Sequence, residues 1–293
     1  MLPMPFPWYL LPQLEFARFK AIDFFPPKPA RIEVLRSICI GSKSRSIGDA
    51  LMLSSLPRRL KQRYPKLRIL TYPRGFNPVV FWNNPHVDGM SFLPDALYGD
   101  DSNEGSGHLI QMKERFFGVE SSESPRPELY LTDSEIRWAR DFVIARSADG
   151  RLNLPLLVIH PFGSTLGAVL EPQVWARFVG EQSERFRIAQ VGVDGQTAIP
   201  GCDFHFLAPK KRAAGRRLFA LLKAADRFIG IDSGPMHVAR AFGIPSLIVT
   251  ERAPLHAGWR SAFLYEDVEY LHVSSLDATG VVRGMSEFAT RFG

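Results

Sequence analysis

The sequence predicts an α/β protein made of two Rossmann-like domains that face a cleft. Short apolar runs alternate with segments whose apolar residues recur at helical spacing, and this alternation begins twice, near residues 36 and 155. Strands that alternate with helices form parallel sheets covered on both faces. The polar stretch 147–153 has no periodicity and separates the two halves. We therefore expect an aromatic and proline-rich leader at 1–30, an N-terminal domain at 31–150 and a C-terminal domain at 151–293.

Length and composition are those of a globular protein with a large core. The 293 residues suffice for two domains, and 45% of them are hydrophobic and 23% charged. Two cysteines argue against a disulfide framework and suit a reducing compartment. No run reaches the roughly 20 apolar residues that a membrane span needs, and the leader lacks the pattern of a secretory signal. We expect a cytoplasmic protein.

The net charge of +6 is concentrated in two basic clusters, at residues 58–68 and 210–217. Such clusters suit phosphate-bearing ligands or an anionic lipid surface, or they are ordinary solvated helix faces. A nucleic-acid partner is disfavoured because aromatic residues do not alternate with the basic ones and no binding module is recognisable. Residues 11–25 of the leader can form an amphipathic helix, which either docks on the body of the protein or lies in a membrane interface. Together with the first basic cluster it predicts weak, salt-sensitive peripheral attachment to an anionic membrane.

The first domain should open with a strand at 36–41, a polar turn, and a helix from 47 to about 63 that is kinked or broken at Pro57. The three-glycine dinucleotide fingerprint is missing, so a hydride-transfer cofactor is not indicated. Further elements are expected as strands at 67–72, 79–82 and 90–93 and as helices at 109–117 and 132–145, the last opened by a capping box.

The second domain should contain a longer series of alternating elements. Strands are expected at 155–160, 186–191, 204–207, 228–231, 246–250 and 270–273, and helices at 172–184, 213–224, 235–242 and 283–292. The turns after 160 and 231 lie at carboxyl ends of strands, where open α/β sheets bind ligands.

The stretch 228–245 is a strand, a tight turn and a helix. Ser233 or Asp232 can cap the free N–H groups of the helix, and Pro235 fits its first turn. Gly234 allows another backbone or a ligand to come close. A helix that begins at the carboxyl end of a strand is suited to bind an anion, although a capped helix of this kind occurs in any α/β protein.

Residues 232–245, DSGPMHVARAFGIP, resemble the donor-site signature of glycosyltransferase family 9, the bacterial heptosyltransferases. Ile47-Gly48-Asp49 stands where that family has an isoleucine-glycine-aspartate turn. The resemblance implies a GT-B fold and inverting transfer of a sugar from a nucleotide diphosphate, for example heptose from ADP-heptose. The acceptor would be a lipopolysaccharide core or another glycan. No cofactor is expected, and no Asp-x-Asp clamp for a metal is found where the diphosphate would bind.

The resemblance also assigns roles to residues. Asp49 would be the catalytic base, with a helix N-cap as the alternative reading of this residue. Asp232 would accept hydrogen bonds from sugar hydroxyls, and His237 would orient Asp232 or touch phosphate. The diphosphate would be held by Gly163, Ser164, Thr165, Ser233, Gly234, Pro235 and Met236. On the acceptor side, Gly48 would keep the Asp49 carboxylate unobstructed, and Lys43 or Arg45 would supply positive charge from the first domain.

Two positions depart from the family pattern. Gln173 replaces a lysine that the family usually carries two residues before the tryptophan, here Trp175. The glutamate expected near the ribose is also replaced, and Asp194 or Gln196 can substitute for it. These departures motivate an alternative: a non-catalytic nucleotide- or glycan-binding relative that acts as the partner of another transferase.

Overall fold

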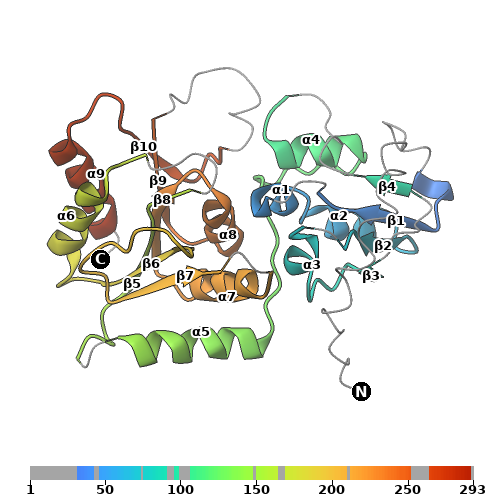
Figure 1. Ribbon diagram of the computed structural model, residues 1–293. Helices are drawn as coiled ribbons and strands as arrows, with labels where there is room; N and C mark the ends of the chain where they lie inside the picture. Colours follow the sequence, from blue (N-terminus) through green and yellow to red (C-terminus); the bar gives the residue numbers. More distant parts are fainter. Residues whose placement is uncertain are drawn as a thin grey trace.

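The computed structural model describes residues 32–42, 46–73, 75–90, 96–98, 106–147, 150–163, 169–209, 212–251 and 264–291. These segments form two lobes, each with a parallel sheet, joined by an extended linker (Figure 1). The first sheet has the strand order β3-β2-β1-β4 and the second β10-β9-β8-β5-β6-β7. The predicted fold class, α/β with two Rossmann-like domains, is confirmed.

The first lobe is built on a four-stranded sheet. Its strands are β1 (Ser37–Ile40), β2 (Arg68–Thr71), β3 (Gly89–Met90) and β4 (Ala96–Tyr98), and its helices are α1 (Ile47–Leu51), α2 (Leu56–Arg63), α3 (Asn77–Val80) and α4 (Leu109–Phe116), with a short 3-10 helix at Ile32–Val34. Leu56 and Leu60 of α2 pack in one buried cluster with Ile38 and Ile40 of β1. The predicted break at Pro57 is confirmed, because α1 ends at Leu51 and Pro57 lies in the first turn of α2.

The strand predicted at 79–82 is wrong, because this part of the chain forms α3. The Asn77 side chain accepts from Ser42 N and donates to Ser42 O, both at 2.8 Å. These bonds fix the start of the helix, and Pro78 suits its first turn. Val79 and Val80 then pack into a core shared with the second lobe. Tertiary contacts thus override the strand preference of the two valines.

The second lobe is a six-stranded sheet with helices on both faces. Its strands are β5 (Leu156–His160), β6 (Arg187–Val193), β7 (Phe204–Ala208), β8 (Arg227–Ile231), β9 (Ser246–Thr250) and β10 (Glu269–His272), and its helices are α6 (Pro172–Gln182), α7 (Arg212–Lys223), α8 (Gly234–Phe242) and α9 (Ala278–Thr290). Trp175 of α6 and Met285 of α9 pack on one face of the sheet. Helices α7 and α8 cover the other face, which is turned toward the first lobe (Figure 1).

Helix α5 (Asp133–Arg146) precedes the polar stretch at 147–153 but packs on the second lobe. The predicted capping box is confirmed: Thr132 accepts from Glu135 N, and the Glu135 carboxylate accepts from Thr132 N. The rings of Trp138 and Phe142 lie against Phe206 of β7. The division of the chain at residue 150 stays a prediction, and the leader at 1–30 lies outside the described residues.

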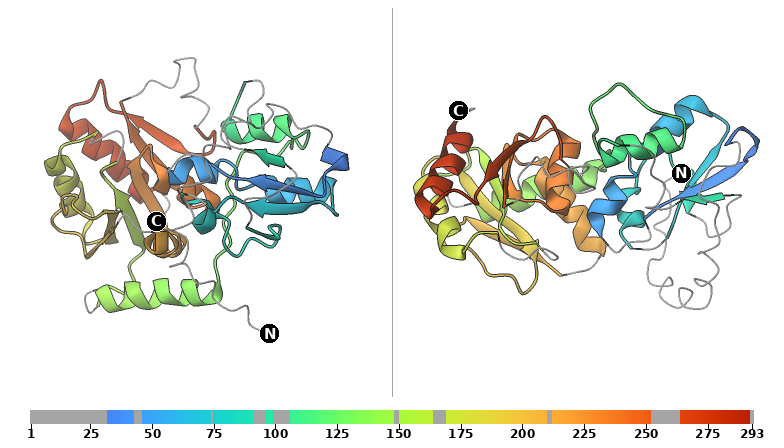
Figure 2. Two further views of the ribbon diagram at one scale, coloured as in Figure 1. Left: turned by 45° about the vertical axis from the view of Figure 1, so that its right-hand side comes forward. Right: turned by 90° about the horizontal axis from the view of Figure 1, so that it is seen from above.

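The two lobes share one apolar core. Leu51 and Val80 of the first lobe belong to the same buried cluster as Phe219 of α7 and Met236 and Val238 of α8. Seen from above, α8 faces α1 across the junction (Figure 2). The lobes are therefore held against each other by burial of apolar surface, which is the main favourable term in folding.

Arg216 of α7 fastens the linker and both lobes at one point. Its guanidinium donates to both carboxylate oxygens of Glu135 at 2.7 Å, to Tyr130 O at 2.7 Å and to Val79 O at 3.1 Å. The Arg216 and Glu135 side chains are only 11% and 20% exposed. Removal of the arginine would leave the Glu135 carboxylate with Thr132 as its donor and without a cationic partner, and would remove this donor from two carbonyl groups.

We predict that Arg216→Ala lowers the free energy of unfolding by about 2–3 kcal/mol, because breaking a largely buried ion pair leaves its partner uncompensated. Urea unfolding followed by circular dichroism measures this. The matched control is Arg140→Ala on the solvent face of α5, where the side chain is 71% exposed and the change should be within about 0.5 kcal/mol. Equal effects of the two substitutions would contradict the prediction.

Candidate functional site

The candidate site lies where the carboxyl ends of parallel strands meet. In the second sheet β6, β5 and β8 are neighbours, and the chain leaves them at Asp194, Pro161 and Asp232. In the first sheet the chain leaves β1 and enters α1, which packs against α8. The starts of α1 and α8, which carry the two sequence motifs, are therefore brought together at the junction of the lobes.

Helix α8 begins without the predicted side-chain cap. Ser233 is the N-cap residue, but its hydroxyl donates back to Ile231 O at 3.0 Å and makes no capping bond to the helix. The fully extended backbone of Ser233, with φ −166° and ψ 175°, accompanies this orientation. The capping hydrogen bond expected from Ser233 is thus not formed. The Ser233 hydroxyl therefore does not cap the first backbone N–H groups of the nine-residue helix. Uncapped N–H groups at the start of a helix suit an anionic ligand.

Asp49 is not an N-cap residue, which removes the alternative reading of this side chain. Ser46 holds that position: its Oγ accepts from Gly48 N at 3.2 Å. Asp49 follows in the first turn of α1 and is half-buried. Its carboxylate is therefore not needed to begin the helix, and it stays a candidate for chemistry.

Two glycines allow α1 and α8 to touch. A methyl group added to Gly234 would overlap Ile47 Cγ2, and one added to Gly48 would lie 3.3 Å from His237 Cδ2. The group that comes close to Gly234, as predicted for this glycine, is thus Ile47 of the first lobe. This contact brings Asp49, one residue from Gly48, and His237, three residues from Gly234, to the same junction.

An aromatic cluster that the sequence did not reveal surrounds His237. Tyr265 Oη lies 2.8 Å from His237 Nδ1, and the ring of Tyr265 lies 4.6 Å from the ring of His108. His108 is the N-cap residue of α4, so the cluster joins the two lobes. The Arg240 guanidinium lies 5.6 Å from the Tyr265 ring and pairs with Asp267 at 2.8 Å. No local pattern marks Tyr265 or His108 in the sequence, because each belongs to an irregular segment just before a secondary element.

Burial keeps the polar groups of this cluster neutral. Loss of hydration, with a smaller contribution from the nearby His108, lowers the pKa of His237 to about 3. Burial is also the main reason why the pKa of Tyr265 is raised well above its usual range and that of Tyr270 to about 12. His237 is therefore an uncharged imidazole, and Tyr265 an intact phenol, at physiological pH.

The remaining predicted residues are less closely grouped. Gly163 is half-buried in the turn after β5, Asp194 is exposed in the turn after β6, and Gln173 is exposed in the first turn of α6. The amide of Gln196 binds Val193 N at 2.9 Å and Phe162 O at 3.0 Å, so it braces these two turns against each other. Ser164, Thr165, Lys43 and Arg45 lie outside the described residues.

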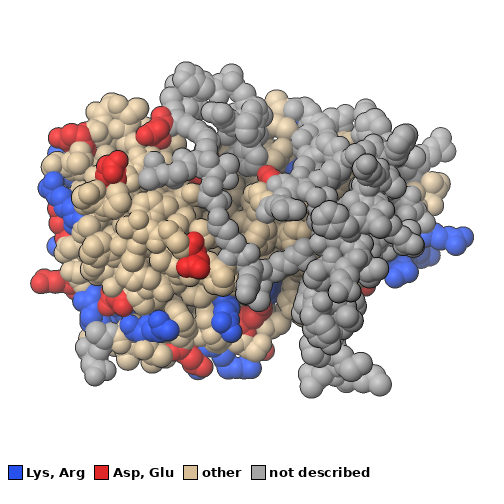
Figure 3. Space-filling view, in the orientation of Figure 1, with Lys and Arg blue, Asp and Glu red and all other residues tan. Residues whose placement is uncertain are grey.

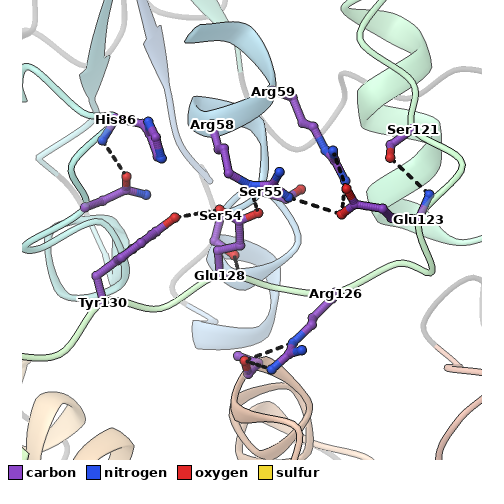
Figure 4. A network of polar contacts seen from close by, with 12 residues as sticks. Ser54, Ser55, Arg58, Arg59, His86, Ser121, Glu123, Arg126, Glu128 and Tyr130 are labelled. Atoms are coloured by element: carbon purple, nitrogen blue, oxygen red, sulfur yellow. Dashed lines mark hydrogen bonds and ion pairs between the residues drawn. The ribbon is translucent and has the colours of Figure 1, made fainter. Parts of the chain in front are cut away.

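Three of the six basic residues in the first basic cluster are paired with acidic residues. Arg58 pairs with Glu128 at 2.7 Å and Arg59 with Glu123 at 2.7 Å (Figure 4). Lys61 pairs with Asp88 at 2.7 Å. A cavity of about 460 Å³ beside Arg58 and Arg59 is therefore walled by charges that already have partners. Over the described part of the face in Figure 3, basic and acidic side chains are likewise mixed along the lower edge. These arginines act in the structure by holding the linker.

Within the described residues no group of three or more His, Cys, Asp and Glu side chains is arranged to hold a metal ion. Among the helices in the described segments, none has the length and apolarity that would let it cross a bilayer.

The sequence profile of glycosyltransferase family 9 (heptosyltransferase) matches residues 194–249, a segment that contains β8 and α8 and ends within β9. This match confirms the resemblance predicted from the motif and supports a glycosyltransferase. A comparison with curated proteins finds no match.

Solved structures with a similar fold include heptosyltransferases and a family 9 glycosyltransferase. ADP-heptose lipopolysaccharide heptosyltransferase II of E. coli superposes with a TM-score of 0.64 at 13% identity, over 88% of this chain and 99% of that chain. A family 9 glycosyltransferase of Veillonella parvula has a TM-score of 0.63 at 13% identity, over 89% and 92%. The iron-containing dodecameric heptosyltransferase TibC of E. coli, with ADP-D-β-D-heptose bound, has a TM-score of 0.55 at 14% identity, over 88% and 77%. The architecture is therefore the GT-B fold.

We predict that acid destabilises the protein in a window set by its buried histidines. Burial lowers the pKa of His160 to about 4 and of His237 to about 3, whereas an unfolded histidine titrates near 6.5. Between these values the unfolded chain binds protons that the folded chain does not. The free energy of unfolding should therefore fall from about pH 6.5 to pH 4, by roughly 1 kcal/mol per pH unit for each histidine.

Urea unfolding at pH 7.5, 6 and 5 measures this slope. The His160→Gln variant should show a shallower dependence, because one of the two groups no longer takes up a proton on unfolding. A free energy of unfolding that is the same at pH 7.5 and pH 5 would show that the two imidazoles are not held neutral.

Proposed function

We propose that this chain, which has the GT-B fold and the α8 signature of glycosyltransferase family 9, is an inverting, metal-independent glycosyltransferase. It would transfer a sugar from a nucleotide diphosphate, for example heptose from ADP-heptose, to a lipopolysaccharide core or another glycan. The observation that carries the proposal is the contact between α1, which bears Asp49, and the start of α8, within the segment that matches the family profile. The bound ADP-heptose of TibC supports the choice of donor.

The reaction requires a base on one side of the anomeric carbon and an anion site on the other. An acceptor hydroxyl attacks the anomeric carbon while its proton passes to the Asp49 carboxylate. The bond between that carbon and the diphosphate oxygen breaks, and its electron pair leaves with the nucleoside diphosphate. Base and leaving group lie on opposite faces, so the configuration inverts. The position of Asp49 on the first lobe, opposite the start of α8, suits this division.

The leaving diphosphate would be stabilised by groups of the second lobe. The start of α8 offers backbone N–H groups and the positive end of the helix dipole. His237, buried in its first turn, adds a neutral imidazole. Gly163, Ser164 and Thr165 in the turn after β5 would complete the diphosphate site, and Asp232 would bind sugar hydroxyls. Fixed dipoles of this kind stabilise developing charge without reorganising during the reaction.

A second candidate follows from Gln173. It occupies the place of the family lysine and is exposed in the first turn of α6, so a cation usual for the family is missing from this position. A relative that binds the nucleotide without catalysis would bind ADP and show neither transfer nor donor hydrolysis. We place the catalytic reading first because Asp49 has no capping role.

We also propose that the protein works in the cytoplasm, where its acceptor would be anchored to the inner leaflet of the membrane. The pairing of Arg58, Arg59 and Lys61 reduces the charge that the first basic cluster offers to such a surface. Peripheral attachment would therefore depend on other parts of the chain, the predicted leader among them.

We predict that Asp49→Asn lowers kcat for sugar transfer by roughly 10²–10⁴-fold, because the amide cannot accept the acceptor proton. The affinity for ADP should stay within about twofold, since the carboxylate acts on the acceptor side. Transfer from ADP-heptose and ADP titration calorimetry measure the two quantities. The control is Asp133→Asn, which alters an acidic residue in the first turn of α5, away from the site. A kcat equal to that of the parent would remove Asp49 as the base.

We predict that chelation leaves transfer intact. Protein dialysed against EDTA and assayed with EDTA present should retain at least about half of its kcat, because helix dipoles and neutral donors take the place of a metal at the diphosphate. Loss of transfer on chelation and its recovery with added Mg²⁺, Mn²⁺ or Fe²⁺ would contradict metal independence. The iron-containing TibC makes iron a necessary arm of this test.

A further inference from the structure

The last strand of the second sheet brings a tyrosine to the edge that carries Asp232. Tyr270 of β10 pairs in register with Ile248 of β9, which pairs with Gly230 of β8. Paired residues of parallel strands point to the same face of the sheet, and the face alternates along each strand. Ile248 and Tyr270 lie in the core beneath α7 and α8. Tyr270 and Asp232, two residues after Gly230, are therefore on the face of the sheet that α8 covers.

The Tyr270 hydroxyl is held by a backbone donor. Tyr265 N donates to Tyr270 Oη at 2.9 Å, so this oxygen acts as an acceptor within the protein. A phenol also carries one proton that it can donate. In the part of the chain that the structure describes, no group accepts this proton, and the side chain is only half-buried. A polar proton in such a place is satisfied by water or by a ligand.

Tyr270 keeps this proton at physiological pH. Its pKa is raised to about 12, mainly by burial and also by the nearby carboxylates of Asp232 and Asp267. Asp267 is engaged by the Arg240 guanidinium at 2.8 Å. Asp232, at the tip of β8 and next to the start of α8, is therefore the acidic neighbour of the phenol on the side of the candidate site.

A phenolic proton and a carboxylate near each other select a particular kind of ligand group. A sugar hydroxyl can accept from the phenol and donate to the carboxylate at the same time. A phosphate oxygen has no proton for the carboxylate and is repelled by its charge. The Asp232 carboxylate has two oxygens with about four acceptor positions, so it can take such a bond in addition to its contacts within the protein. The pair therefore fits a hydroxyl better than a phosphate.

We propose that Tyr270 is a further substrate-binding residue, which donates its hydroxyl proton to a hydroxyl of the transferred sugar while that hydroxyl donates to the Asp232 carboxylate. The inference rests on the function proposed above, which assigns the sugar to Asp232, and it adds a residue that distinguishes the sugar from the rest of the nucleotide. The backbone N–H of Tyr265 fixes the phenolic oxygen in this arrangement. The contact is not made when a nucleoside diphosphate binds without its sugar.

The first test compares two ligands on one variant. Tyr270→Phe keeps the ring in the core and removes the hydroxyl. It should weaken binding of ADP-heptose by roughly three- to tenfold, the usual effect of one neutral hydrogen bond, and leave the affinity for ADP within about twofold. Titration calorimetry with both ligands gives this ratio without any need for transfer. Tyr98→Phe, which removes a buried tyrosine hydroxyl in the first lobe, should change neither affinity.

The second test identifies the hydroxyl. A set of ADP-heptose analogues, each lacking one sugar hydroxyl, is titrated into the parent and into Tyr270→Phe. The analogue without the contacted hydroxyl has already lost the hydrogen bond, so Tyr270→Phe should leave its affinity nearly unchanged. The other analogues should keep the full effect of the substitution. A general disturbance of the pocket would instead weaken ADP and every analogue alike.

The outcomes separate this inference from the proposed function. Equal effects of Tyr270→Phe on ADP and ADP-heptose, or no effect on either, would overturn the sugar contact even if the protein transfers sugar. A parent that binds ADP-heptose with a Tyr270-dependent affinity, but transfers the sugar to no acceptor, would support the inference and reject the transferase. A parent with no measurable affinity for ADP-heptose would overturn the contact together with the proposed donor.

Discussion

The structure depends on the close approach of two strand-turn-helix units, one from each lobe. Ile47 and Gly48 at the start of α1 lie against Gly234 and His237 at the start of α8, and neither glycine position has room for a side chain. This contact brings together the two short motifs that identify the family. It also places a carboxylate and the positive end of a helix on opposite sides of one junction. A methyl group at Gly234 would overlap the Ile47 side chain, so a substitution there would disturb the contact between the lobes.

A shared apolar core and two arginines hold the lobes together at this junction. Leu51, Val80, Phe219 and Met236 bury their surface in a single cluster that crosses from lobe to lobe. Two arginines add directional hydrogen bonds between the parts of the chain. Arg126 donates to a backbone carbonyl at the end of α8, and Arg216 donates to one in α3. The shared core buries apolar surface from both lobes, and the hydrogen bonds of the two arginines fix the relative position of the lobes.

Around the junction, burial decides the charge state of the polar groups. His237, Tyr265 and Tyr270 are kept neutral because water is largely excluded from them. Neutral donors in a dry site lose little by reorganisation when negative charge develops beside them. The same burial makes the free energy of unfolding depend on pH, because histidines of the unfolded chain bind protons that the buried imidazoles of the folded protein do not bind.

The sequence by itself determined the alternation of strands and helices, the break at Pro57, the capping box at Thr132 and Glu135, and the α8 motif, because each is a local pattern set by backbone geometry and by spacing along the chain. Only the tertiary structure decided that Val79 and Val80 form a helical turn, that Ser46 rather than Asp49 caps α1, and that Arg58 and Arg59 are paired. It also supplied Tyr265 and His108, which meet from different lobes. Such contacts depend on how the helices and strands pack against each other. They cannot be predicted from the sequence because burial, and not spacing along the chain, selects the partner of each polar group.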